Sequence, residues 1–499
     1  MLWLFFGSLG CAGCAGSEEP RPAKGVNTTA AGDGLVGWPP VPSTLLASDA
    51  GLLAGELAKV KAAAASRPVP SSAGGRAPDI VVIVLDTVRA DHLGVYGYDR
   101  DTTPNLDAWA QAARVYENAW TDSPWTLPAH ASMFTGKPER EHAARALPLT
   151  DVRKGAPLAE SFSTVAERLQ AAGWRTVAVT GNRAFLHPSF GLSQGFDAWV
   201  NEAPERDTRG VGYTPADRIR PMAEAVLAQA DEHPLFLFVN FMDAHTPYVP
   251  RRGFVRSPEL LRPASLPGNG GGFRRASAKL LQGGRLDPDV QASWSEAYDA
   301  ELRFLDLELG LLLQQVKAPH VYILADHGEY LGEHSLVEHA KDVYEPVLHV
   351  PFLARAPDLA PGRDASLVQT HDLAWMVLSA AGLPHDDIER PDDLAVSELT
   401  LTLKKDLGAR AYGARFNRTR RAFRVGAHKL ILGTDGSRES FDLAADPAET
   451  HPFAALPPIF DGLAAAWLAA HPEQPVVGLG EGSGVGPDEE ALRALGYVE

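Results

Sequence analysis

The chain has 499 residues, and its 45% hydrophobic and 22% charged residues exclude a wholly disordered protein and a collagen-like or coiled-coil repeat. Its formal net charge of −17 argues against a nucleic-acid-binding protein, because such proteins contact phosphates through cationic side chains. The two cysteines, Cys11 and Cys14, both lie near the N-terminus. The body of the protein therefore has no disulfide, no zinc-cysteine site and no catalytic cysteine.

The N-terminal residues 1–16 combine a short apolar run at 2–6 with small residues around the two cysteines, a pattern typical of a bacterial lipoprotein signal. We expect export to the cell envelope, in the periplasm or on the outer surface, with a membrane tether through a lipid on Cys11 or Cys14. The alternative is a misassigned start codon or an untethered tail. Residues 17–78 are rich in Ala, Pro, Gly and Ser, which predicts a disordered linker with one helical patch at 52–64.

Four continuous apolar runs, at 79–85, 176–180, 234–240 and 320–325, predict strands that are buried on both faces. Helical patterns at 163–172, 215–230 and 293–315 lie between them. This alternation predicts an α/β fold with a doubly wound, mostly parallel sheet, which we assign to a catalytic domain over 79–400.

The last hundred residues carry a different pattern, with short strand signals and a helix signal. They predict a smaller C-terminal subdomain over 401–499, in which a helix packs on an antiparallel sheet. The expected strands are 409–416, 422–425, 429–432 and 440–443, and the expected helix is 460–469.

Polar side chains follow each of the four predicted strands. Asp86 follows the first, Asn182 the second, Asp243 and His245 the third, and Asp326 with His327 the fourth. Ligands of open α/β sheets bind where the carboxyl ends of the strands converge. Two carboxylates and one imidazole suit a single divalent ion, with Ca²⁺, Mg²⁺, Mn²⁺ and Zn²⁺ all possible. Taken singly, each Asp could instead cap a helix or turn.

A second signal is the segment 126–136, which predicts a helix. Thr126 can cap it, Pro128 is tolerated in its first turn, and Gly136 ends it. Because a helix N-terminus concentrates unpaired N–H groups and positive dipole, a hydroxyl at this position would face a docked anionic ester.

These motifs together resemble the sulfatase family of the alkaline phosphatase superfamily. The resemblance runs from about residue 79 to 499. Its matching segments are 86–98, 126–136, 191–197, 245–248, 298–301, 326–334, 441–449 and 492–497.

The resemblance implies that Asp86, Asp326 and His327 bind the metal ion, with Thr126 as nucleophile and further ligand. It also implies that His245 contacts the ester near the leaving group. The family helix usually begins with Cys or Ser, any residue, Pro, Ser and Arg, and its first residue is oxidised to formylglycine. Here the segment begins with threonine and has His130 in the place of the Arg, so formylglycine cannot form. The family's usual Asp-Asp pair is Asp86-Thr87, one carboxylate short, which leaves the identity of the metal open.

Four further residues are candidate substrate contacts. His339 and Lys341 match a region that supplies a cation to the substrate anion, or they belong to a solvated loop. Asn182 either hydrogen-bonds an ester oxygen or only forms a turn, and His130 has a substrate role or a packing role. The polar insertion 250–288, which contains Arg251, Arg252, Arg274 and Arg275, either shapes the substrate entrance or is a disordered loop.

The sequence therefore predicts a metal-dependent, sulfatase-like hydrolase of anionic esters with Thr126 as its nucleophile. One alternative is a phosphoester hydrolase or a phosphoryl or phosphoalkyl transferase that uses Thr126. The other is an inactive sulfatase-like binding protein, suggested by the absent Arg and second Asp.

Overall fold

The computed structural model describes residues 45–72, 75–146, 155–201, 211–266, 271–390, 393–400, 413–475 and 489–494. All of them belong to one compact unit. The predicted signal segment and the first part of the linker lie outside the described residues, so export and lipid attachment remain predictions. Among the described residues, no helix has the length and apolar character needed to cross a membrane.

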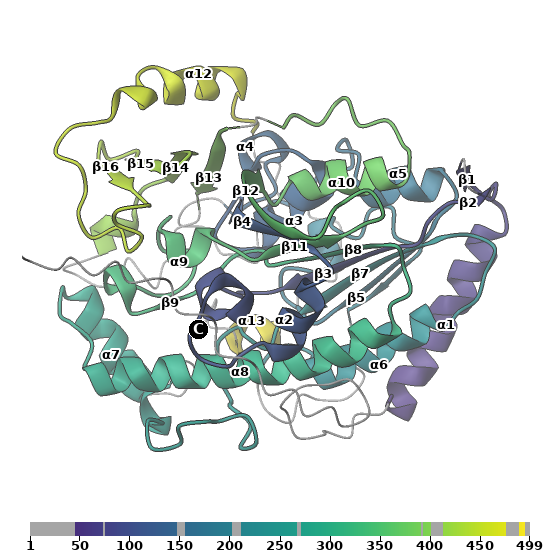
Figure 1. Cartoon of the computed structure of the whole chain (residues 1–499), viewed down its shortest axis with the longest axis horizontal. Helices are drawn as coiled ribbons and strands as arrows, with labels where there is room; N and C mark the ends of the chain where they lie inside the picture. Colours follow the sequence, from purple (N-terminus) through teal and green to yellow (C-terminus); the bar gives the residue numbers. More distant parts are fainter. Residues whose placement is uncertain are drawn as a thin grey trace, which may run out of the picture. The chain divides into compact units, whose positions relative to one another are not determined.

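The core of the molecule is an eight-stranded sheet with the order β12-β4-β11-β8-β3-β7-β5-β6 (Figure 1). Only β11 runs antiparallel to its neighbours, β4 and β8. The other pairings are parallel, so the predicted mostly parallel sheet is confirmed. The strands are β3 (Ile80–Leu85), β4 (Arg114–Trp120), β5 (Arg175–Thr180), β6 (Ala198–Val200), β7 (Leu235–Phe241), β8 (His320–Leu324), β11 (Phe352–Arg355) and β12 (Gly362–Gln369).

Helices cover both faces of this sheet (Figure 1). One layer contains α1 (Ala47–Ala64), α2 (Pro104–Ala110), α6 (Ala216–Leu227) and α8 (Pro288–Gln315), in which α8 packs on both α2 and α6. The other contains α3 (Thr126–Thr135), α4 (Glu139–His142), α5 (Val165–Ala171) and α10 (Asp372–Ala380), in which α10 packs on α3 and α5. The doubly wound arrangement places the carboxyl ends of β3, β5, β7 and β8 side by side.

The helix α1 corrects the prediction that residues 17–78 form a disordered linker. The predicted helical patch is longer than expected and packs on β5, β6 and α6. Its side chains Leu53 and Val60 are buried, and the buried carboxylate of Asp49 pairs with Arg218 on α6 (2.6 Å). This part of the segment is therefore folded, because its alanine-rich turns still present apolar side chains to the domain.

The smaller sheet contains β13 (Ala395–Leu399), β14 (Arg420–Val425), β15 (His428–Gly433) and β16 (Arg438–Asp442), all antiparallel. It begins before residue 401, so the expected boundary at 400 is too late. Residues 409–412 of the first expected strand lie outside the described residues, and Gly413–Phe416 form a 3₁₀ helix instead. The expected helix is α12 (Leu463–Ala470), close to the predicted position.

The remaining strands and α-helices of the described residues are short. They are the strands β1 (Ser71–Ser72), β2 (Gly75–Arg76), β9 (Tyr330–Leu331) and β10 (Val337–Glu338), and the helices α7 (Gly271–Leu281), α9 (Glu345–Leu348) and α13 (Glu489–Ala494).

Candidate active site

Three fully buried side chains meet at the carboxyl ends of β3 and β8. One ligand atom from each of Asp86, Asp326 and His327 lies within 4.8 Å of the others. Asp86 Oδ2 accepts a hydrogen bond from Asn182 Nδ2 (3.0 Å), and Asp326 Oδ1 accepts one from the Thr87 N–H (3.2 Å). The remaining carboxylate oxygens, Asp86 Oδ1 and Asp326 Oδ2, have no hydrogen-bond partner among the described residues. Such buried acceptors are costly unless a cation or a donor satisfies them.

The imidazole and the two carboxyl groups have the protonation behaviour that a bound cation would require. The His327 Nδ1–H donates to the Gly328 carbonyl (3.0 Å), so that Nε2 carries the free lone pair of the neutral ring. Burial raises the pKa of Asp86 to about 7. Burial, followed by the negative charge of Asp86, raises the pKa of Asp326 well above its usual value. A divalent ion would stabilise both ionised carboxylates, so this donor set fits one such ion.

Thr126 lies beside these three residues, at the start of α3. Its Oγ1 is 3.5 Å from His327 Nε2 and 3.5 Å from Asn182 Nδ2. Trp125, in extended conformation, is the N-cap residue, so Thr126 is the first residue of the helix and the prediction that it caps the helix is wrong. The helix ends at Gly136 in the left-handed conformation (φ 68°), as expected. The hydroxyl of Thr126 therefore lies beside His327 and Asn182, the two side chains that adjoin the carboxylates.

The predicted substrate residue Asn182 contacts both Thr126 and the metal group, the name we give to the candidate ligands Asp86, Asp326 and His327. Its side-chain oxygen accepts from the N–H groups of Ala184 (3.1 Å) and Phe185 (3.0 Å), which fixes its amide nitrogen toward Asp86 and Thr126. Asn182 thus forms the turn that one alternative expected, and its contact with an ester oxygen remains a prediction.

His130 lies one helical turn after Thr126. Its Nδ1–H donates to the Thr126 carbonyl (2.9 Å), and its ring packs against Phe134 and Phe238. Burial lowers its pKa to about 4. Its Nδ1 is also 3.6 Å from Asp326 Oδ2, so that His130 borders the metal group from α3.

Two more histidines form a row with His327. The ring centroid of His339 is 4.4 Å from that of His327 and 4.9 Å from that of His245. His339 Nδ1 lies 2.8 Å from Glu329 Oε1, whose pKa burial raises to about 7. Glu329 was not predicted as a site residue, although it belongs to the same motif as Asp326 and His327.

His245 donates its Nδ1–H to the neighbouring Thr246 carbonyl, so the neutral ring presents the lone pair of Nε2. Burial lowers the pKa of His245 to about 4. An anionic ester beside this ring would favour the protonated form and raise its pKa again. The last predicted substrate residue, Lys341, is buried, and its Nζ lies 3.6 Å from Glu338.

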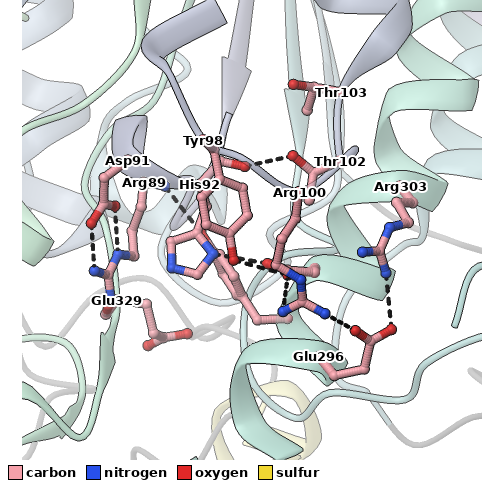
Figure 2. Close-up of polar contacts among 12 residues, drawn as sticks. Arg89, Asp91, His92, Tyr98, Arg100, Thr102, Thr103, Glu296, Arg303 and Glu329 are labelled. Carbon is pink, nitrogen blue, oxygen red and sulfur yellow. Dashed lines mark hydrogen bonds and ion pairs between the residues drawn. The ribbon is translucent and has the colours of Figure 1, made fainter. Parts of the chain in front are cut away.

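A polar network braces the loop that follows Asp86 (Figure 2). The Tyr298 hydroxyl, from α8, donates to the Thr87 carbonyl (2.8 Å) and accepts from the Arg89 N–H (2.9 Å). The Arg89 guanidinium pairs with Asp91 (2.8 Å) and donates to the Glu329 carbonyl (3.0 Å). The same network joins the segment 92–100 to α8, through His92 Nδ1 with Asp299 Oδ1 (2.8 Å) and through Arg100 with Glu296.

The chain is similar to known sulfatases along most of its length. The protein-family model described as "Sulfatase" matches residues 78–383. The ulvan-active sulfatase of Formosa agariphila is 27% identical over 409 residues, which cover 74% of this chain and 76% of that protein. The choline-sulfatase of Rhizobium meliloti is 24% identical over 431 residues, covering 74% and 81%.

Among solved structures, the phosphonate monoester hydrolase of Agrobacterium radiobacter superposes with a TM-score of 0.61 at 19% identity, covering 79% of this chain and 96% of that chain. This likeness confirms the fold. The match of the family model to residues 78–383, with the similarity to these two sulfatases, shows that the chain is a sulfatase-like ester hydrolase that belongs to the sulfatase family.

Proposed function

We propose that this protein is a metal-dependent hydrolase of sulfate esters that uses the Thr126 hydroxyl as its nucleophile. The observation that carries the proposal is the position of Thr126 Oγ1, 3.5 Å from His327 Nε2 at the edge of a group with two unsatisfied carboxylate oxygens. Asp86, Asp326 and His327 would hold the ion. When bound, such an ion polarises the ester oxygens and lowers the pKa of an adjacent hydroxyl.

The residues of the chain then have distinct tasks. Thr126 Oγ1 forms a bond to sulfur as the bond from sulfur to the leaving oxygen breaks, and the hydroxyl proton ends on the released alcohol. Water next cleaves the Thr126 sulfate ester, which restores the hydroxyl and releases hydrogen sulfate. Asn182 donates to an ester oxygen, and His245 carries the proton to the leaving oxygen once the bound anion has raised its pKa.

The test compares three variants with aryl sulfate, aryl phosphate and aryl phosphodiester substrates, each supplied with Ca²⁺, Mg²⁺, Mn²⁺ or Zn²⁺ after metal removal. We expect Thr126→Ala to lower kcat for the aryl sulfate by about 1,000-fold or more, as for loss of an activated nucleophile. Thr126→Ser, which keeps a hydroxyl, should retain measurable turnover. Asp326→Asn should weaken metal binding about 100-fold, as measured by calorimetry.

Mass spectrometry after rapid quenching should find a sulfate group on the peptide that contains Thr126. Faster turnover of a phosphate ester with a phosphorylated Thr126 would replace the proposal with the phosphoester alternative. Metal binding without turnover of any of these esters would favour the inactive binding protein.

A further inference from the structure

The segments 251–266 and 271–286, which we call the basic arm, carry a charge opposite to that of the whole chain. They contain eight basic residues and a single acidic residue, Glu259, in a protein with a formal net charge of −17. The basic residues are Arg251, Arg252, Arg256, Arg262, Arg274, Arg275, Lys279 and Arg285. This cluster of positive charges does not help the chain to fold, because exposed like charges that lie close together repel each other.

The basic arm is folded on α8 and is not the disordered loop that the sequence also allowed. Buried Glu296 accepts hydrogen bonds from the backbone N–H groups of Arg256 (2.7 Å) and Ser257 (3.2 Å). Ser293 accepts from the Arg262 N–H (2.8 Å), and the Trp294 indole donates to the Ser265 carbonyl (2.7 Å). These contacts use the backbone of the arm and do not engage its cationic groups.

Arg251 anchors the start of the arm. Its guanidinium lies between Asp243 (3.3 Å) and Glu301 (3.2 Å), and it stacks on the Phe304 ring, 3.1 Å from the centroid. By contrast, Arg252, Arg275, Lys279 and Arg285 are exposed, and within the described part of the chain they have no ion-pair partner. Arg262 has one, the exposed Asp289 at 3.6 Å, which is too weakly held to neutralise the surface.

The basic arm follows a residue that contacts the candidate active site, and its end packs on a loop of that site. Three residues before Arg251, the Tyr248 hydroxyl donates to Glu329 Oε2 (3.2 Å), the carboxylate that also holds His339. At the other end, Leu286 packs directly over Gly332, so closely that a Cβ on this glycine would collide with it. The arm, which includes α7, thus borders Gly332, three residues after Glu329.

We propose that the basic arm binds further anionic groups of the same substrate molecule, and that the substrate is therefore a sulfated polysaccharide. This inference rests on the proposed sulfate ester hydrolysis. Salt screening limits the range over which each surface charge acts to about 8 Å at physiological ionic strength. The negative charge of the whole chain therefore does not cancel a local row of cations. A substrate with one sulfate would use only the metal and its neighbours, whereas a polymer with repeated sulfates would also contact the arm.

The test measures binding without turnover, so that it does not depend on the proposed catalysis. The full chain with Thr126→Ala is titrated with dextran sulfate, with unsulfated dextran and with a DNA duplex at two salt concentrations. In this background the triple variant Arg252→Ser/Arg275→Ser/Arg285→Ser should weaken dextran sulfate binding about tenfold, and higher salt should weaken it further. Unsulfated dextran should not bind.

The matched control, Lys59→Ser/Lys61→Ser/Lys317→Ser, removes the same charge from exposed side chains on and after other helices and should change the affinity less than about twofold. With Thr126 restored, the arm variant should keep the kcat and KM of a small aryl sulfate. Equal dextran sulfate affinity in the arm and control variants would overturn the proposal. Equally tight binding of DNA would also overturn it, because the surface would then not select a sulfated polysaccharide.

Discussion

Two threonines define this site at the scale of single residues. Thr126 presents its hydroxyl to the metal group, but Thr87 turns its own hydroxyl to the Asp86 carbonyl (2.7 Å). Thr87 also has a positive φ of 59°, a conformation that costs a non-glycine residue about 1 kcal/mol or more. The hydrogen bonds of Tyr298 to the carbonyl of Thr87 and of the Thr87 N–H to Asp326 stabilise it. Thr87 therefore contributes its backbone to the site, through its N–H and its carbonyl.

A pH dependence follows from the buried pair of His371 and Asp122, whose Nδ1 and Oδ1 are 2.5 Å apart. Despite burial, the charge and hydrogen bond of Asp122 raise the pKa of His371 to about 9. A raised histidine pKa stabilises the fold fully below the unfolded value of about 6.5, and this stabilisation is lost as the pH rises toward 9. The free energy of unfolding should fall by on the order of 3 kcal/mol across this window.

Denaturant titrations at several pH values check this prediction. His371→Gln should remove most of the decline, whereas the exposed His451→Gln should keep it. A wild-type protein with the same free energy of unfolding at pH 6.5 and pH 9 would contradict it. The pair matters for the site because Asp122 lies four residues before α3 and also accepts a hydrogen bond from Thr370 Oγ1 (2.9 Å). This contact connects the segment that precedes α3 to the segment that precedes α10.

At the scale of elements, α1 shows how a segment of linker-like composition becomes part of a domain. Its alanine and glycine residues resemble a tether, but Leu53 and Val60 lie on the face that packs on the sheet and are only 2% exposed. The pair of Asp49 with Arg218 fixes the start of the helix against α6.

Leu53→Ala should therefore lower the free energy of unfolding by about 2 to 5 kcal/mol, the cost of removing a large side chain from a packed interior. Thermal and chemical denaturation of the full chain measure this change. The control Lys61→Ala, at an exposed position of the same helix, should stay within about 0.5 kcal/mol of the wild type. A Leu53→Ala protein as stable as the control would mean that α1 does not belong to the cooperative unit.

At the scale of the whole molecule, the small antiparallel sheet supports the loop that carries His339. Four non-glycine residues of this loop have positive φ values between 52° and 61°, namely His334, Ser335, Glu338 and Ala340. The loop continues to Asp342, which pairs with Arg420 of β14 (2.8 Å), and to Glu345, which pairs with Lys429 of β15 (3.0 Å). Lys429 is fully buried and also pairs with Glu449 (2.7 Å). Contacts from the second sheet thus hold a strained loop in place.

Lys429→Met should destabilise the protein by about 3 to 5 kcal/mol, because it removes the cation beside the buried Glu449 and the nearer of the two cations beside the partly buried Glu345. Exposed Lys317→Met is the matched control and should change the free energy of unfolding by less than about 0.5 kcal/mol. If Lys429→Met unfolds at the same denaturant concentration as the control, the small sheet does not stabilise the loop. Metal affinity measured on the folded variant separates loss of stability from loss of the site.

The sequence by itself determined the central half of the sheet and the residues that converge at its edge, Asp86, Asp326 and His327. The strands β8, β3, β7 and β5 are buried along almost their whole length, so each reads as a continuous apolar run. The polar residues after such runs converge because parallel strands end at one edge of a sheet. The positions of the two cysteines likewise exclude formylglycine, because no cysteine occurs beyond residue 14 and the first residue of the nucleophile helix is threonine.

Only the tertiary structure decided the rest. The strand β12 lies at the edge of the sheet and exposes much of its length, and its neighbour β4 mixes buried with partly exposed residues. Neither strand contains a continuous apolar run, so neither was predicted. The contact of Tyr298 with Thr87 and the docking of the basic arm on α8 join residues far apart in the chain. Local patterns specify burial and helix ends, but such contacts depend on how whole layers pack, which no short segment of sequence encodes.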